Sequence, residues 1–222
     1  MSASQPFTHR AVDDAAAWSA LVMELGEGRR TLSGLWGEPG AVSMALLGAR
    51  AIEVATLACP GGSFPSVGRH HPPAQRLERA IFDLFGLRPE DAPDERPWLD
   101  HGRWPIRHPL GAGEAHGGQR DLYEFLPAEG HGLHQIPVGP VHAGIIEPGH
   151  FRFTAGGETV VRLEERLGYV HKGVERLMAG KRPAEAARIS GRLSGDSTVA
   201  YAIAFARAAV SAWVIEAPPR AH

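Results

Sequence analysis

The fold of the second half of the chain depends on residues 137–166, PVGPVHAGIIEPGHFRFTAGGETVVRLEER. Glycine and proline recur through its first half, so a regular helix is excluded there. Phe151 and Phe153 then alternate with polar residues, which is the period of a strand with one apolar face. The turn sequence AGGE follows at 155–158 and leads into a second β-branched run. We therefore predict a β-hairpin over residues 150–166.

Three side chains of this stretch carry groups that take part in chemistry, namely His142, Glu147 and His150. They are separated by five and three residues, a spacing that matches neither the His-Glu-x-x-His zinc helix nor a zinc knuckle. Three interpretations stay open. The residues could ligate a metal, as in a metal-dependent hydrolase; a histidine could transfer a proton to a bound substrate near neutral pH; or the histidines could hydrogen-bond the backbone of a tight turn.

The composition indicates a globular protein without a nucleic-acid partner. Of the 222 residues, 43% are hydrophobic, and the net charge of −2 is spread without long runs of one sign. The single cysteine, Cys59, excludes an internal disulfide and a metal cluster held by cysteines of this chain alone, and we expect a small buried side chain there. The N-terminal residues lack the apolar core of a secretory signal, so we expect a reducing, cytoplasmic setting.

Residues 197–215 are nearly uncharged and about as long as a membrane-spanning helix. Much of the stretch is alanine, which contributes little to insertion, and Arg207 near its middle costs about 2.5–3.5 kcal/mol on insertion scales. We therefore predict a buried or interface helix instead of a membrane span.

The first part of the chain, residues 1–87, has the pattern of a small sheet covered by helices. Apolar residues recur at helical spacing before Gly26 and before Gly86, and three apolar runs lie between these segments. Helices are expected at 12–25 and 72–85, and strands at 31–36, 40–47 and 49–58.

The remaining chain divides into two further parts. Residues 88–136 are rich in Pro, Gly and His and predict an extended linker, with Trp98 and Trp104 packed against a surface. The last part, residues 137–222, begins with the hairpin. Helices are expected after it at about 173–180, 183–189 and 196–215.

Residues 138–180 resemble the start of the large subunit of membrane-bound nickel-iron hydrogenases of the formate-hydrogenlyase type. They also resemble the related quinone-site subunit of respiratory complex I, the NADH:quinone oxidoreductase. The Gly-Pro-x-His opening, the hairpin and the sequence GYVHKGVE occur in the family's order. Residues 71–87, followed by RPWLDHGRWPIRHPLG at 96–111, look like the small complex I subunit that docks on the quinone-site subunit. In hydrogenases of this type the two parts are fused in the same order.

The resemblance implies an α/β docking domain of the α+β kind with a small mixed sheet, followed by a hairpin and helices that begin a hydrogenase-like large-subunit domain. It also implies that the hairpin region lines a quinone cavity. The implied cavity residues are Gly139, Pro140, His142, Glu147 and His150, with His142 as the proton donor and His150 as the later histidine of the loop.

The resemblance also implies partners and cofactors. The chain is expected to be a subunit of an oxidoreductase complex, peripheral on the cytoplasmic face of the cell membrane, and to contact the membrane only through partner subunits that include an iron–sulfur subunit. We expect this chain alone to bind no cofactor and no metal. Iron–sulfur clusters, and a nickel-iron or quinone site, would belong to the complex.

Two departures from the family pattern qualify this expectation. Ser190 and Leu193 stand where active nickel-iron hydrogenases have a Cys-x-x-Cys, and Gly191 stands where the quinone-site subunit has a tyrosine. The family's large subunit also continues far beyond the length of this chain. We therefore expect a truncated or split member that is inactive by itself and needs another polypeptide. The alternative is a non-catalytic assembly or interaction protein derived from the same family.

Overall fold

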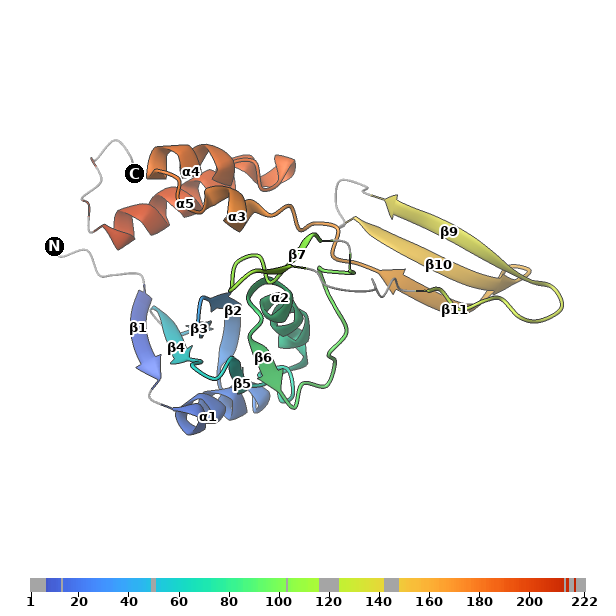
Figure 1. The fold of residues 1–222 in the computed structure, drawn as a ribbon, viewed down its shortest axis with the longest axis horizontal. Coiled ribbons are helices and arrows are strands. Elements are labelled where there is room, and N and C mark those ends of the chain that lie inside the picture. The colour runs from blue at the N-terminus through green and yellow to red at the C-terminus, as the bar shows by residue number, and fades with distance from the viewer. Residues whose placement is uncertain are drawn as a thin grey trace.

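The computed structural model of the protein contains a mixed sheet with helices, a projecting antiparallel sheet and a C-terminal group of helices (Figure 1). The structure describes residues 7–12, 14–48, 51–102, 104–115, 124–141, 148–213, 215 and 218.

The N-terminal sheet has four strands in the order β1-β4-β3-β2, formed by β1 (Phe7–Val12), β2 (Thr31–Glu38), β3 (Ala41–Leu47) and β4 (Ile52–Ala58). Strand β1 is parallel to β4 and the other pairs are antiparallel, so the sheet is mixed, as predicted. The three strands predicted from sequence are confirmed. Strand β1 was not predicted, because its six residues alternate without a strong apolar face.

Two helices cover one face of this sheet, α1 (Ala15–Gly26) and α2 (Gln75–Phe85), with the short 3₁₀ turn η1 (Pro72–Ala74) before α2. Helix α1 begins three residues later than predicted because the side chain of Asp14 caps it by accepting a hydrogen bond from the backbone N–H of Ala17 at 2.8 Å. Trp18 is fully buried in the core, and its Nε1 donates to the carbonyl of Pro65 at 3.0 Å. Cys59 is 3% exposed, which confirms the predicted buried thiol.

Two buried carboxylates of α2 organise the loops that surround the helix. Glu78 accepts hydrogen bonds from the backbone N–H of Val67 and the hydroxyl of Ser66, at 2.5 and 2.9 Å. Asp83 accepts hydrogen bonds from three consecutive backbone N–H groups at 98–100, at 2.8, 2.6 and 3.3 Å. Each carboxylate therefore fixes a segment that has little secondary structure of its own.

Three short strands lie between α2 and the projecting sheet. Strand β6 (Arg88–Glu90) pairs in parallel with β5 (Ser63–Pro65), and β7 (Ile106–Arg107) pairs with β8 (Glu114–Ala115). Residues 88–115 of the predicted linker are thus partly paired, and strands of two or three residues are too short to give a periodic pattern in the sequence. As predicted, Trp98 packs on a surface, since its ring lies 5.4 and 5.2 Å from the guanidinium carbons of Arg76 and Arg79.

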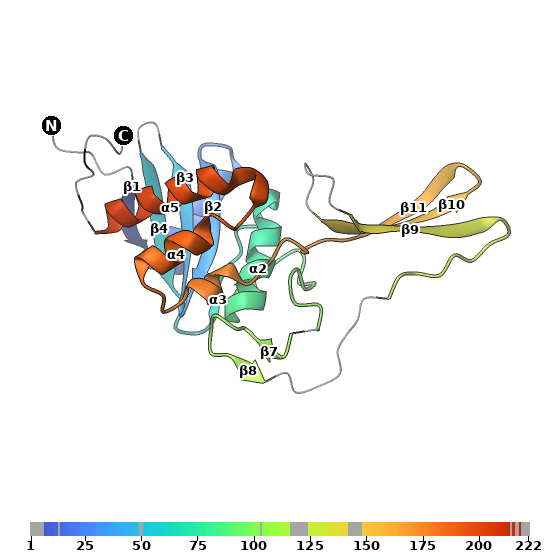
Figure 2. The same cartoon turned by 90° about the horizontal axis from the view of Figure 1, so that it is seen from above.

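The projecting sheet has three antiparallel strands, β9 (Leu133–Val141), β10 (Gly149–Gly156) and β11 (Thr159–Arg166), in the order β11-β10-β9 (Figures 1 and 2). Strands β10 and β11 are the predicted hairpin. Strand β9 was missed because two prolines and a glycine interrupt its alternation. It crosses the predicted boundary between residues 136 and 137, and the division into 1–87, 88–136 and 137–222 stays a prediction.

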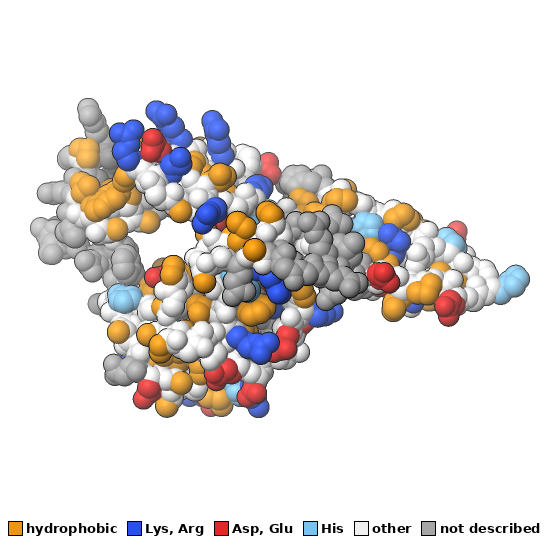
Figure 3. Space-filling model, viewed as in Figure 1, with side chains coloured by type: hydrophobic (Ala, Val, Ile, Leu, Met, Phe, Trp, Pro, Cys, Tyr) orange, Lys and Arg blue, Asp and Glu red, His pale blue; other side chains and the backbone are white. Residues whose placement is uncertain are grey.

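The C-terminal helices are α3 (Val174–Met178), α4 (Pro183–Ser190) and α5 (Thr198–Ala212), with the 3₁₀ turn η2 (Gly195–Ser197) before α5. Helices α4 and α5 lie over the face of the N-terminal sheet opposite α1 (Figures 1 and 2), and Figure 3 shows an opening between them and the sheet. Helix α5 has no buried residue, and its Val199 and Ile203 are 70% and 48% exposed. Among the described residues, no helix combines the length and apolar character that a membrane crossing requires.

Removal of the Asp83 carboxylate should destabilise the fold. In Asp83→Ala three backbone N–H groups lose their buried acceptor, and we expect the free energy of unfolding to fall by about 3 kcal/mol, measured by urea denaturation. Glu95→Ala is the matched control because Glu95 is an exposed carboxylate of the same region, and it should change stability by less than about 0.5 kcal/mol. Equal effects of the two substitutions would contradict this role of Asp83.

The ionisation of Glu78 should give stability a specific pH dependence. Burial raises the pKa of this carboxyl above its value of about 4.3 in an unfolded chain, against the hydrogen bonds that lower it. The folded state therefore binds more protons between the two pKa values, so this contribution to stability is complete below the unfolded pKa and is lost as the pH rises through the folded pKa.

Glu78→Gln cannot ionise and should remove this dependence. We expect the stability of the variant, relative to the wild type, to improve steadily from about pH 4 to pH 7 in urea titrations. Glu95→Gln should show no such trend, since Glu95 is exposed. A constant difference between Glu78→Gln and the wild type across this range would disprove the raised pKa.

Candidate functional site

The end of β9 and the start of β10 form a tight backbone crossing. Gly139 has φ +90°, and a Cβ at this position would collide with the carbonyl oxygen of Gly149, so only glycine fits. The Gly139–Pro140 peptide bond is cis. The ring of His150 lies directly beside this crossing, with its Nδ1 2.9 Å from the carbonyl oxygen of Gly139.

The hydrogen bonds of His150 define its tautomer. A carbonyl oxygen only accepts, so Nδ1 carries the proton, and Nε2 of the neutral ring accepts from Arg152 Nη2 at 3.4 Å. Phe125 closes the arrangement: its ring centroid lies 5.0 Å from that of His150 and 4.3 Å from the guanidinium carbon of Arg152. Both nitrogens of His150 are therefore engaged within the projecting sheet.

The other predicted cavity residues are placed only in part. His142 and Glu147 lie outside the described residues, so their predicted roles as proton donor and cavity residue stay predictions. In the described part of the chain, no three His, Cys, Asp or Glu side chains are grouped in a way that could hold a metal ion.

Ser190 and Leu193, which the resemblance places at the family's cysteine positions, have side chains without a thiolate. Ser190 is buried at the end of α4, and its hydroxyl donates to the carbonyl of Ala187 at 2.9 Å. The Leu193 side chain is apolar, and its carbonyl accepts from Lys172 Nζ at 2.6 Å. Neither side chain provides the thiolate that would hold nickel.

A junction joins the base of the projecting sheet to the N-terminal part. Gly168 has φ +89°, and a Cβ there would meet the carbonyl oxygen of Trp98, in the loop that Asp83 fixes. His101 lies in the same junction, where burial, and to a smaller extent the charge of Arg166, lowers its pKa. Sequence reasoning missed Asp83 and His101, because an acid within a helix and a histidine within a loop give no periodic signal.

A cavity of about 400 Å³ lies where the C-terminal helices meet the N-terminal part. Its walls are tied together, since Arg176 donates to the carbonyl of Pro109 at 3.0 Å and the ring of Trp104 lies 5.3 Å from that of His171. The contact confirms the predicted packing of Trp104. The lining combines apolar side chains with His171, Lys172, Glu175 and Arg176, so the cavity suits a partner group that has both apolar and polar parts.

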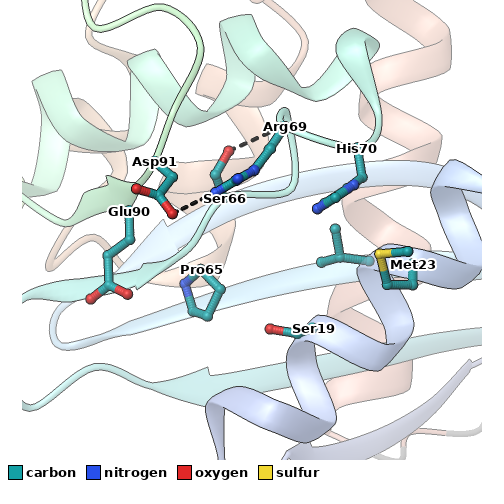
Figure 4. A pocket seen from close by; sticks show the side chains of 9 residues that line it. Ser19, Met23, Pro65, Ser66, Arg69, His70, Glu90 and Asp91 are labelled. Carbon is teal, nitrogen blue, oxygen red and sulfur yellow. Dashed lines mark hydrogen bonds and ion pairs between the residues drawn. The ribbon is translucent and has the colours of Figure 1, made fainter.

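A smaller pocket of about 190 Å³ lies between α1 and the loop that follows β5 (Figure 4). Arg69 and Asp91 form an ion pair at one side of the pocket (Figure 4). The hydroxyl of Ser66, which also lines the pocket, donates to the buried Glu78. His70 and Met23 face each other across the other side. Glu90 at the pocket accepts from the hydroxyl of Ser63 at 2.6 Å, so the charged groups of the pocket have partners within the protein and it has the character of a structural junction.

Comparisons with known proteins found one matching family and several similar proteins. Residues 40–115 match the respiratory-chain NADH dehydrogenase 30 Kd subunit family. Hydrogenase-4 component G of Escherichia coli is 34% identical over 207 residues, covering 89% of this chain and 37% of the relative. Formate hydrogenlyase subunit 5 of Escherichia coli is 33% identical over 169 residues, covering 72% of this chain and 30% of the relative.

A third relative comes from a different type of complex. The C/D subunit of the NADH-quinone oxidoreductase of Bdellovibrio bacteriovorus is 25% identical over 161 residues, covering 67% of this chain and 29% of the relative. The chain thus spans about a third of the length of each of these relatives. It belongs to the lineage of hydrogenase and complex I-related subunits, with a domain of the 30 Kd subunit family at residues 40–115.

Proposed function

We propose that the protein is a subunit, or the N-terminal portion of a subunit, in a membrane-associated oxidoreductase complex. It supplies a docking domain and the base of a cavity loop, while the electron carriers reside on neighbouring chains. One observation carries the proposal: the segment that matches the 30 Kd subunit family and the projecting sheet that follows it occur in one chain and meet at the Gly168–Trp98 junction.

The C-terminal helices supply the docking surface in this proposal. Helix α5 leaves Val199, Tyr201 and Ile203 exposed, and such apolar surface is favourable only when another layer covers it. The cavity beside Lys172 is lined in part by residues of α3 and offers a second place for a partner. A second polypeptide, such as an iron–sulfur subunit, would cover α5 and complete the large-subunit fold.

The substrate side of the proposal rests on the loop that joins β9 to β10. His142 is the proposed proton donor, and His150 with Gly139 holds the base of the loop in a fixed shape. The electron acceptor would be a quinone, or protons that are reduced to hydrogen. Partner subunits would oxidise NADH or formate. A position on the cytoplasmic face of the membrane completes the proposal.

A second function is favoured by the residues expected at the family's cysteine positions, Ser190 and Leu193. Ser190 bonds to its own helix and Leu193 is apolar, so this chain by itself offers no nickel ligand at that place. A non-catalytic assembly or interaction protein, which keeps the docking surfaces without the redox site, is consistent with this observation. The two functions differ in whether a change at the cavity loop alters turnover.

Purification of the tagged chain from its native membranes tests the subunit role. We expect partner subunits and protein-bound iron to co-purify, with nickel present only if another chain supplies the ligands. In hydroxyl-radical footprinting, Tyr201 and Trp213 should be labelled less in the complex than in the isolated chain, because both are exposed here. Met23 on α1 is the internal control and should not change. A chain recovered alone, with Tyr201 fully reactive, would refute the proposal.

Replacement of His150 separates catalytic from assembly roles. In the purified complex, His150→Ala should lower quinone reduction or hydrogen evolution by at least about tenfold, because the cavity loop loses its anchor on Gly139. His150→Asn can still donate to that carbonyl and should retain more activity. His134→Ala is the control, since His134 is exposed on β9 of the same sheet. Full activity of His150→Ala, with every partner still present in the purified complex, would favour the assembly function.

A further inference from the structure

The C-terminal helical segment has a charge opposite to that of the whole protein. Residues 167–213 contain seven Lys and Arg and three Asp and Glu, whereas the chain as a whole has a net charge of −2. In Figure 3, Lys and Arg side chains gather over α4 around a single acidic side chain. The positive charge is therefore concentrated on one surface.

The basic residues lie within α4 and directly before and after it. Arg188 is in the helix, Lys181 and Arg182 precede it, and Arg192 follows it, and all four are exposed. Ala186 and Ser190 lie on the opposite face and are buried against the neighbouring helices. Arg188 therefore points away from the neighbouring helices, and the other three cations extend the basic surface beyond the two ends of α4.

These cations have few partners within the protein. Arg182 is 84% exposed in its side chain and forms an ion pair with Glu185 at 3.3 Å. In the described part of the chain, Lys181, Arg188 and Arg192 form no ion pair and no side-chain hydrogen bond. An unpaired cluster of this kind leaves a positive potential that an external anionic surface can neutralise.

We propose that the basic face around α4, defined by Lys181 and Arg182 before the helix, Arg188 within it and Arg192 after it, docks on the anionic surface of a phospholipid bilayer. Each Lys or Arg near such a surface adds to the attraction, which decays within a Debye length. A protein partner is less suited to this face, because interfaces between proteins centre on aromatic or large apolar anchors. Between residues 181 and 192 the only large apolar side chain is that of Ile189, which is half-buried.

This inference differs from the expectation that the chain contacts a membrane only through partner subunits. The bilayer contact needs no partner and no redox site, so it stands or falls independently of the proposed function. Because the attraction is electrostatic and the face lacks apolar anchors, the association should be reversible and sensitive to ionic strength.

The test is sedimentation of the full chain with large unilamellar vesicles. Vesicles of phosphatidylcholine and phosphatidylglycerol should bind the protein at low ionic strength and release it at high ionic strength, whereas pure phosphatidylcholine should not bind it. Arg188→Glu/Arg192→Glu should weaken binding by about tenfold or more. The matched control Arg88→Glu/Arg107→Glu changes the net charge equally at two exposed sites elsewhere and should alter binding by less than about threefold.

Four outcomes would overturn the proposal: no binding to anionic vesicles, equal binding to pure phosphatidylcholine, equal losses in the two double variants, or undiminished binding by Arg188→Glu/Arg192→Glu. Loss of a partner protein in that variant, without any vesicle binding by the wild type, would assign the basic face to a protein. Circular dichroism verifies that both variants are folded, since all four substituted side chains are exposed.

Discussion

The carboxylate of Asp83 is the constraint on which the arrangement of the N-terminal part and the projecting sheet depends. It is buried within α2, yet it accepts three consecutive backbone N–H groups from a loop that has no regular hydrogen bonding of its own. Burial raises the pKa of Asp83, against the hydrogen bonds that lower it. That loop carries Trp98, whose carbonyl meets Gly168 at the base of the projecting sheet. A single side chain on one segment thus fixes the surface on which the other segment rests.

The candidate site is also held in place by a small number of contacts. The crossing of β9 and β10 requires glycine at 139, and the carbonyl exposed there orients His150. Arg152 and Phe125 then enclose the ring from the side. The backbone geometry, the tautomer of the histidine and the aromatic contact are mutually dependent, so a change in one of them alters the other two.

Much of the fold could be predicted from the sequence, in the segments where apolar residues recur with a regular period. The three antiparallel strands of the first sheet, the β10–β11 hairpin and the positions of α3 to α5 follow from apolar periods and from glycine or proline at their ends. Strand β9 could not be predicted because Pro137 and Pro140 hide its alternation. The roles of Glu78 and Asp83 could not be predicted either, since their backbone partners lie 11 to 17 residues away and only the folded chain brings them together.

Having the N-terminal part and the projecting sheet in one polypeptide has a thermodynamic consequence. Two separate proteins must lose translational and rotational freedom to associate, whereas segments of one chain meet at an effective concentration in the millimolar range. The small contact between Gly168 and the Trp98 carbonyl would be too weak to hold independent proteins together. Within one chain this contact is sufficient, and a large interface is not required there. The junction can therefore change by mutation without separating the two parts.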